Sequence, residues 1–403
     1  MMRLLLSAAI AAALPAAAFA VDYYVDNRTG SDKNDGRSPE RAFATIGKAT
    51  SRLKAGDTLN LAPGKYYESI HIRSSGTPEK PIVINGNGSV LCGLTRLEDS
   101  GWTSKGGDLY FFADKSAWGA LRPKVYIGEE RLISAGNKLP EDLKPMEASW
   151  QKDGVYFRAE RGRKPGDYNL MASRQKGFTL HSGVYMAAQS YVVFNDITAE
   201  RFANDGFNVH LCCHGLEFRN ITGRWNGDDG FSVHEDVQAT VYNGYFHHND
   251  FGIQDVGIAQ TYFFGCLVES NRLCGVDFFG GCRSMRDSTI RGNSGSQMRI
   301  FRGRGDKVQE DSRNPMLVPT VYLRNVEIGP GEGTGISVRE TARLVAVDCS
   351  ISGVAIGVDN VKDGDVNLTG VKFSNCSKLP VLSRSGGNLA LNGCEGAQPP
   401  EKK

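Results

Sequence analysis

The twelve residues at positions 225–236, WNGDDGFSVHED, combine four carboxylates with one tryptophan and one histidine. A further carboxylate, Asp205, begins a related stretch, DGFNVHL, at 205–211. If the two stretches lie side by side, their carboxylates repel one another unless a cation lies between them, and a set of oxygen ligands without thiols favours Ca²⁺. We therefore predict a calcium site whose ligands are Asp205, Asp228, Asp229 and Asp236. The alternative is a turn whose aspartates cap backbone amides at a solvated edge.

Both stretches also carry a histidine four residues after their glycine, namely His210 and His234. Imidazole has an unperturbed pKa of about 6.5, so it can accept a proton near neutral pH. We predict that the two histidines belong to the same site as the acidic residues. The alternative is that each is an ordinary surface residue.

These stretches are part of a repeat of about 22 residues. Asparagine recurs at positions 204, 226, 249, 271 and 293, with spacings of 22, 23, 22 and 22, and a glycine and a short alternating run follow each one. Such short strands cannot bury an apolar face alone, but coils stacked about 4.8 Å apart bury a continuous core. The repeat therefore predicts an all-β fold, a parallel β-helix with one asparagine at a turn of each coil, in left-handed backbone with local hydrogen bonds. A β-sandwich gives no reason for so constant a spacing.

Strand alternation predicts which side chains of each coil face outward. Counting from the glycine of a coil, the first and third residues should point into the core and the second and fourth should point outward. His210 and His234 then lie in one outward column, one layer of about 4.8 Å apart, and the same counting from Gly295 puts Arg299 at the fourth position. Asp255 falls at an inward position, where a lone carboxylate is costly, so either the register slips or the coil bulges there.

The ends of the chain differ from the repeat. The first residues, MMRLLLSAAIAAALPAAAFA, have the basic start, apolar run and small-residue cleavage site of a secretory signal peptide, so the mature protein is expected in the periplasm or outside the cell. The sequence SPERAFATIGKATSRLKAG is typical of an amphipathic helix that caps the open end of a solenoid. The predicted organisation is a signal peptide at 1–20, an N-terminal segment with the capping helix at 21–56, the first coils at 57–114, an insertion of long loops at 115–180, the main β-helix at 181–395 and a polar tail at 396–403.

Composition limits the classes of partner. The formal net charge is +2 over 403 residues, which gives no reason to expect nucleic acid or an acidic membrane surface as a partner. We expect a monomer that acts without a membrane. The nine cysteines are an odd number; Cys349, Cys376 and Cys394 each end a short apolar run, and either two of them are bridged or all are small buried side chains.

The N-terminal segment carries a resemblance to a known group of proteins. The stretch YYVDNRTGSDKNDGRSPERAFATIGKA at 23–49, followed by AGDTLNLAPGKYYESIHI and PIVING, resembles the opening of secreted right-handed β-helix proteins that act on carbohydrates. The pattern is most similar to polysaccharide lyases of the family-nine pectate lyase type, which also contain an Asn-x-Asp-Asp-Gly-Phe coil. The resemblance implies a right-handed single-stranded β-helix and β-elimination on an acidic, uronate-containing polysaccharide. It also implies a catalytic calcium ion at Asp205, Asp228 and Asp229, with Asp236 as a further match.

The lysine that serves as the base in that family has no counterpart on the coils of this chain. No lysine occurs between Lys176 and Lys307, and the comparable positions hold Gln254 and Asp277. The residues predicted to take over catalysis are His210, His234, Asp277 and Arg299, and those predicted to contact the sugar are Trp225, Arg283, His248 and Gln254.

Two alternatives share these residues. The order Asn204-Asp205, Gly227-Asp228-Asp229, His247-His248 and Arg283 is similar to that of β-helical polygalacturonases, which are inverting hydrolases, and an epimerase on the same scaffold is a related possibility. A protein that binds carbohydrate without catalysis would use Trp225 and the other aromatic residues to stack on sugar rings. The sequence favours the calcium-assisted lyase.

Overall fold

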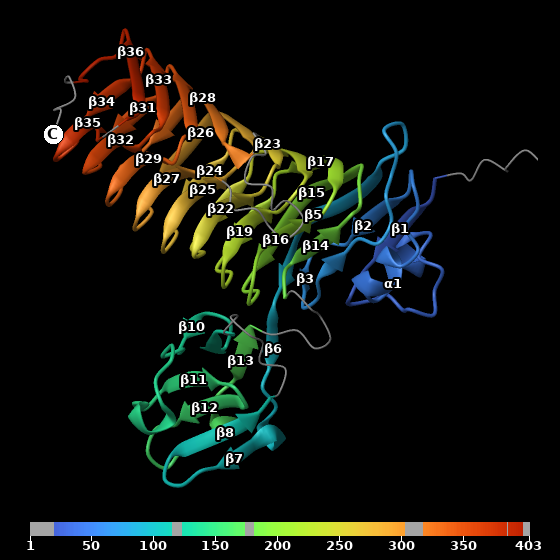
Figure 1. Ribbon diagram of the computed structural model, residues 1–403. Helices are drawn as coiled ribbons and strands as arrows, with labels where there is room; N and C mark the ends of the chain where they lie inside the picture. The colour runs from blue at the N-terminus through green and yellow to red at the C-terminus, as the bar shows by residue number, and fades with distance from the viewer. Residues whose placement is uncertain (1–19, 115–122, 174–180, 303–316, 385, 398–403) are drawn as a thin grey trace, which may run out of the picture.

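The computed structural model describes residues 20–114, 123–173, 181–302, 317–384 and 386–397. These residues form a long parallel β-helix with a smaller β domain beside it (Figure 1). The predicted all-β class and parallel β-helix are confirmed. The predicted signal peptide lies outside the described residues except for Ala20, as do residues 398–403 of the predicted tail.

One face of the β-helix is a ten-stranded parallel sheet to which each coil contributes one strand. Five of the predicted site residues, His210, His234, Gln254, Asp277 and Arg299, are outward side chains of this sheet. In spatial order the strands are β4 (Ile70–His71), β14 (Val184–Ala187), β16 (Phe207–His210), β19 (Asp229–Val233), β22 (Phe251–Val256), β25 (Cys274–Phe279), β27 (Ser296–Phe301), β29 (Thr334–Arg339), β32 (Ile356–Lys362) and β35 (Leu379–Ser383).

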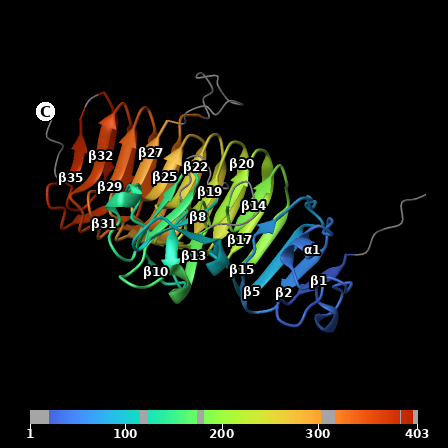
Figure 2. The same ribbon diagram turned by 90° about the horizontal axis from the view of Figure 1, so that it is seen from below.

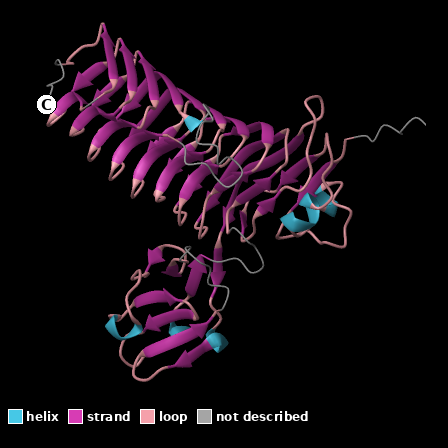
Figure 3. Cartoon of the chain, in the orientation of Figure 1, coloured by secondary structure: helices cyan, strands magenta, loops and turns pink. Residues whose placement is uncertain are grey.

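The remaining faces form one bent sheet of eighteen parallel strands (Figure 3). Its strands are β1 (Asp22–Val25), β2 (Thr58–Leu61), β3 (Lys65–Tyr66), β5 (Ile82–Cys92), β15 (Val192–Glu200), β17 (Cys213–Arg219), β18 (Thr222–Arg224), β20 (Val237–Tyr242), β21 (Tyr245–His247), β23 (Gln260–Phe264), β24 (Leu267–Glu269), β26 (Cys282–Arg291), β28 (Thr320–Ile328), β30 (Arg343–Val347), β31 (Ser350–Ser352), β33 (Asp365–Thr369), β34 (Lys372–Ser374) and β36 (Asn388–Asn392).

The N-terminal helix is shorter than predicted. It covers only α1 (Ile46–Thr50), and the residues before it form a single 3₁₀ turn, Pro39–Arg41. Ile46 and Ala49 are nonetheless buried in the main core, as a cap requires. No helix among the described residues has the length and apolar character needed to cross a membrane.

The inward positions of the coils form the core, as the alternation predicts. Phe207 and Phe231 occupy equivalent places on β16 and β19 and are fully buried, and Phe218 of β17 packs edge-on against Phe231 at 5.1 Å between ring centroids. The predicted register fails only in the last of these coils. There Met298, not Ser296, pairs with Val276, so Arg299 takes the place of the second residue of the coil instead of the fourth.

The recurring asparagines form a buried ladder instead of local turns. Asn226, Asn249, Asn271 and Asn293 are fully buried, and the Oδ1 atom of each of the last three accepts a hydrogen bond from the backbone N–H of the asparagine one coil earlier, at 2.9–3.0 Å. The left-handed residue is the one before, such as Trp225. The prediction of local bonds in left-handed backbone is therefore wrong, because the side chains satisfy backbone groups of neighbouring coils.

Removal of one ladder side chain should destabilise the fold. Asn249→Leu leaves the N–H of Asn226 buried without its partner and removes one of the hydrogen bonds to the carbonyl of Gly223, at a cost of about 1–3 kcal/mol for the unpaired N–H. Chemical unfolding measures the change. Asn367→Ala, at an exposed strand position, is the control and should change stability by no more than about 0.5 kcal/mol. Equal stability of the two variants would contradict a structural role for the ladder.

The predicted insertion of long loops is a folded domain. It begins at Leu94, inside the range predicted for the first coils, and it has its own apolar core. Figures 1 and 2 show it on one side of the solenoid. One antiparallel sheet contains β6 (Leu94–Arg96), β9 (Val125–Ile127), β10 (Arg131–Leu132) and β13 (Leu170–Ser173); the other contains β7 (Trp102–Ser104), β8 (Leu109–Ala113), β11 (Glu147–Gln151) and β12 (Gly154–Arg158).

Polar contacts hold this side domain against the solenoid. Lys65 of β3 bridges Glu129 of the side domain at 2.5 Å and the buried Glu200 of β15 at 2.9 Å. Lys124 donates from Nζ to the backbone oxygen of Asn226 at 3.0 Å. The second contact brings a lysine of the insertion to the coil that carries the acidic motif.

Asp255 points into the core without a register slip or a bulge. It pairs in register with Val233 of β19 and Phe278 of β25, and its carboxylate lies 3.5 Å from the Nε atom of Arg283. Both side chains are fully buried. The expectation of a slip or bulge is wrong because an internal cation makes the inward carboxylate tolerable.

The nine cysteines all lie within the described residues, and none of them forms a disulfide there.

Candidate functional site

The predicted acidic residues meet at the start of two neighbouring strands. Asp205 lies just before β16, and Asp228 and Asp229 lie at the start of β19. Each offers a carboxylate oxygen, and these atoms all lie within 4.8 Å of one another. The backbone N–H of Asp229 donates to Oδ1 of Asp205 at 3.0 Å, so the coil stacking itself fixes the cluster.

Burial and mutual repulsion dominate the electrostatics of this cluster. Asp205 and Asp229 are buried, and burial together with the neighbouring carboxylates raises the pKa of each well above its ordinary value. The pKa of Asp228 is also raised, by burial and by Asp250. A hydrogen bond from Ser232 opposes the shift at Asp229.

The cluster fits a divalent cation. Oδ1 of Asp229 is buried and has no hydrogen-bond partner among the described residues, and the same holds for Oδ1 of Asn208, on the neighbouring strand beside Ser232. Ca²⁺ takes six to eight oxygen ligands from carboxylates, amides and water, and a cation would compensate both the repulsion and the unpartnered oxygen. Asp205, Asp228 and Asp229 are the residues that would hold it.

The fourth predicted ligand does not belong to this cluster. Asp236 follows the end of β19, and its carboxylate lies 3.2 Å from Nε2 of His214. It is absent from the group of described acidic residues whose oxygens converge. The prediction for Asp236 is wrong because the length of β19 separates it from Asp228 and Asp229.

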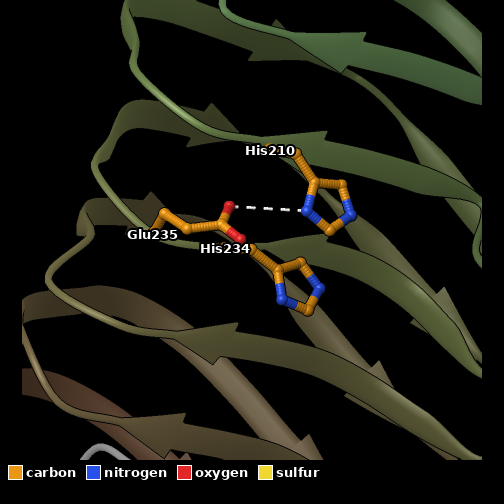
Figure 4. A group of neighbouring side chains, drawn as sticks. All are labelled: His210, His234 and Glu235. Atoms are coloured by element: carbon orange, nitrogen blue, oxygen red, sulfur yellow. Dashed lines mark ion pairs between the residues drawn. The ribbon is translucent and has the colours of Figure 1, made fainter. Parts of the chain in front are cut away.

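The two predicted histidines stack on each other, as the column predicts. The rings of His210 and His234 are 4.2 Å apart at 9° between planes, and Glu235 lies 3.4 Å from Nδ1 of His210 (Figure 4). Nε2 of His234 contacts the Ser232 hydroxyl at 3.1 Å, and Ser232 in turn bonds Asp229. Hydrogen bonds therefore connect the histidine pair to the acidic cluster.

This histidine pair is poorly suited to act as a base. Burial and the neighbouring His210 lower the pKa of His234 to about 3, which makes the neutral ring a weak base. His210, His234 and Glu235 each offer one ligand atom, and these atoms lie within 4.8 Å of one another, so the group has the spacing to hold a metal ion. Binding a ligand beside the acidic cluster, whether an ion or part of a sugar, is therefore the role that the geometry allows.

Lys124 is the functional candidate that sequence reasoning missed. It comes from the side domain, just before β9, and its Nζ atom contacts the backbone of Asn226, two residues before Asp228. The pKa of Lys124 is lowered overall, mainly by burial and further by Arg272. Asp250 and Asp228 oppose the shift. No periodic signal marks position 124, because the insertion lies outside the repeat.

A cavity of about 430 Å³ adjoins this lysine where the side domain meets the coils. The guanidinium carbons of Arg201 and Arg224 lie 4.3 Å and 4.6 Å from the Trp225 ring. The cavity thus has an aromatic ring and positively charged side chains in its wall. Trp225 and His248, two of the predicted sugar contacts, both line it. Its lining residues are Lys124, Tyr126, Glu130, Leu132, Arg201, Trp225 and His248.

The other predicted residues lie elsewhere. Arg283 is fully buried and donates to the carbonyls of Ala259 and Gly280, so the prediction that it contacts substrate is wrong. Asp277 and Arg299 bond to each other on β25 and β27, two and three coils from Asp229.

Gln254 precedes Asp277 in the same outward column and lines a second cavity. The structure therefore does not bring Asp277 and Arg299 to the acidic coil.

Comparison with known proteins gives the handedness of the solenoid. Residues 182–314 match the family model "Right handed beta helix region". The structure is similar to pectate lyase Pel9A, with a TM-score of 0.58 and 14% identity over 92% of this chain and 79% of that one. It is also similar to a glycoside hydrolase, with a TM-score of 0.56 and 11% identity over 93% of this chain and 97% of that one.

One relative aligns by sequence over a short segment. The uncharacterized protein YwoF of Bacillus subtilis (strain 168) is 38% identical over 61 residues, which span 15% of this chain and 13% of that protein. At these identities the structural likeness establishes the fold. The chain is thus a right-handed parallel β-helix protein whose solved structural relatives include a pectate lyase and a glycoside hydrolase.

Proposed function

We propose that this chain is an exported polysaccharide lyase that cleaves a uronate-containing glycan by cation-assisted β-elimination. The observation that supports the proposal best is the convergence of Asp205, Asp228 and Asp229 beside a lysine. Two of the three are buried, and within the described part of the chain one oxygen of Asp229 has no hydrogen-bond partner. The fold shared with a pectate lyase and the signal-like N-terminus agree with it.

The proposed reaction needs three groups in one place. Ca²⁺ at the cluster would neutralise the uronate carboxylate and make the adjacent C5 proton more acidic. Lys124, in its uncharged form, would accept that proton; the C5–H electron pair would form the C4–C5 double bond, and the glycosidic oxygen would leave C4 with its bonding electrons and take up a proton. Trp225 and His248 would hold the sugar in the cavity next to Lys124.

A glycoside hydrolase receives less support from the site. Inverting hydrolysis uses two carboxyl groups about 6.5–9.5 Å apart, with a water molecule between them. Here the ligand oxygens lie within 4.8 Å of one another, which suits a shared cation better. Arg283, part of the resemblance to polygalacturonases, is in the core and cannot reach a substrate.

The activity test compares pectate, alginate and glycosaminoglycans as substrates. A lyase produces unsaturated uronates, which absorb in the ultraviolet, and a chelator should abolish the signal while added Ca²⁺ restores it. New reducing ends without absorbance would show hydrolysis instead. Absence of both signals on all three glycans would overturn the proposal in favour of binding alone.

The cation itself can be tested without turnover. Asp228→Asn removes one charge from the cluster and should weaken Ca²⁺ binding on the order of tenfold or more in titration calorimetry. Asp236→Asn is the matched control, because Asp236 lies apart from the cluster, and its affinity should equal that of the wild type. Unchanged Ca²⁺ affinity in Asp228→Asn would remove the metal site from the proposal.

A further inference from the structure

A second cavity lies on the outer face of the ten-stranded sheet, away from the acidic cluster. Its volume is about 590 Å³, within the usual range for ligand sites of about 300–1,000 Å³. Its lining residues are Gln254, Val256, Phe279, Arg299, Phe301, Arg302, Arg339 and Glu340. Strands β22, β25, β27 and β29, one to four layers from β19, supply the lining residues, so the cavity is centred about 12 Å along the solenoid from Asp229.

Coil stacking builds an aromatic surface in this cavity. Phe279 and Phe301 are paired on neighbouring strands, and their rings stack at 5.1 Å and 13°. They lie in the outward column and are only partly buried, in contrast to Phe278, which the core encloses completely. Because the ring faces are turned toward each other, the ring edges that remain outside the stack form an apolar strip that a sugar can contact.

Guanidinium groups border the same surface. Arg299 lies 5.4 Å and Arg339 lies 5.3 Å from the Phe301 ring. Arg299 donates two hydrogen bonds to the carboxylate of Asp277, which already balances its charge. Arg339 donates to the Ser337 hydroxyl at 3.1 Å, and within the described part of the chain no carboxylate forms an ion pair with it. Arg339 therefore keeps its charge available for a ligand.

We infer that this cavity is a distal subsite for a carboxylated sugar of the bound glycan. A guanidinium beside an apolar strip can bind a uronate carboxylate while the sugar ring packs against the strip, whereas a neutral sugar would leave the arginine unpaired. The inference rests on the proposed function for the identity of the glycan. It adds that the chain binds its substrate at a second point, two to three coils from the cation.

Binding measured without turnover tests the subsite. Short and long oligosaccharides of pectate, alginate and a glycosaminoglycan are titrated calorimetrically into the protein in the presence of EDTA, with carboxyl-reduced long oligosaccharides as neutral probes. Arg339→Gln and Phe301→Ala should each weaken binding of the long acidic oligosaccharides about tenfold, and leave the short ones unchanged. Arg343→Gln is the control, because Arg343 pairs with exposed Asp365 on the other sheet and should not matter.

The outcomes separate this inference from the lyase proposal. Unchanged affinity of Arg339→Gln, an equal loss for carboxyl-reduced probes, or no binding of any acidic oligosaccharide would each overturn the subsite. If wild-type protein forms no unsaturated product but Arg339→Gln still loses affinity for long acidic oligosaccharides, the lyase proposal fails and the subsite stands. If unsaturated product forms and Arg339→Gln binds long acidic oligosaccharides with wild-type affinity, the subsite fails and the lyase proposal stands.

Discussion

Replacement of Lys124 by methionine is expected to lower the rate of β-elimination by about 10²- to 10⁴-fold, the usual contribution of a general base. Methionine keeps much of the length and apolar stem of lysine but cannot accept a proton. The acidic cluster does not depend on the Nζ atom, so Ca²⁺ affinity should persist. Ultraviolet detection of unsaturated uronate on the best glycan substrate measures the rate.

A matched variant separates chemistry from loss of structure. Lys138→Met removes a lysine of the same domain that pairs with Glu147, away from the coils, and it should keep wild-type activity. Thermal unfolding of Lys124→Met should remain close to that of the wild type, because the contact of Lys65 with Glu129 still holds the side domain. Activity of Lys124→Met within a few-fold of wild type would exclude Lys124 as the base.

The second large effect concerns stability. Asp255→Val should lower the free energy of unfolding by about 3–5 kcal/mol, because it leaves the guanidinium of Arg283 buried without a counter-charge. Arg283→Met should cost less, since the Asp255 carboxyl that remains can take up a proton. The double variant Asp255→Val/Arg283→Met should recover most of the loss, because an apolar pair of similar volume avoids desolvation of both charges. Denaturant unfolding of the three variants measures these differences.

The pH dependence of the same pair has a definite sign. Burial raises the pKa of Asp255 to about 6 from an ordinary value of 3.8, and Arg283 only partly opposes the shift. The folded state therefore binds the proton more tightly than the unfolded state, so the stability that this group contributes is present at low pH and is lost as pH rises through about 6. The double variant should thus gain stability relative to the wild type between about pH 4 and about pH 7. A difference that stays constant with pH would contradict the raised pKa.

Much of the fold could be predicted because each coil repeats one local pattern. Spacings near 22 residues and period-two alternation were enough to place Phe207 and Phe231 in the core and to stack His210 on His234. The same register brought Asp205 next to Asp228 and Asp229. In a solenoid, residues one repeat apart in the sequence become contacts, so periodicity carries tertiary information.

The parts that could not be predicted break that local rule. Asp255 and Arg283 lie on different strands and compensate each other only across the core, which no alternation pattern can show. Gly295 looks like the coil glycine, but Gln297 holds that place and accepts the ladder bond from Asn293, so Arg299 shifts by two positions. Lys124 reaches the site through the packing of two domains, for which the sequence contains no repeat.

The first and last strands of the side domain, β6 and β13, are antiparallel neighbours, and Leu94 pairs directly with Ser173. The two ends of the domain therefore lie next to each other. A module with its ends so close can be gained, exchanged or lost in a single genetic event without any change in the pitch of the coils around it. If Lys124 supplies the proton acceptor, the base belongs to the side domain while the acidic cluster belongs to the β-helix, so the two parts of the site could have evolved separately. Homologues would then be expected to share the β-helix and its acidic cluster but to differ in whether, and how, they cleave the sugar chain.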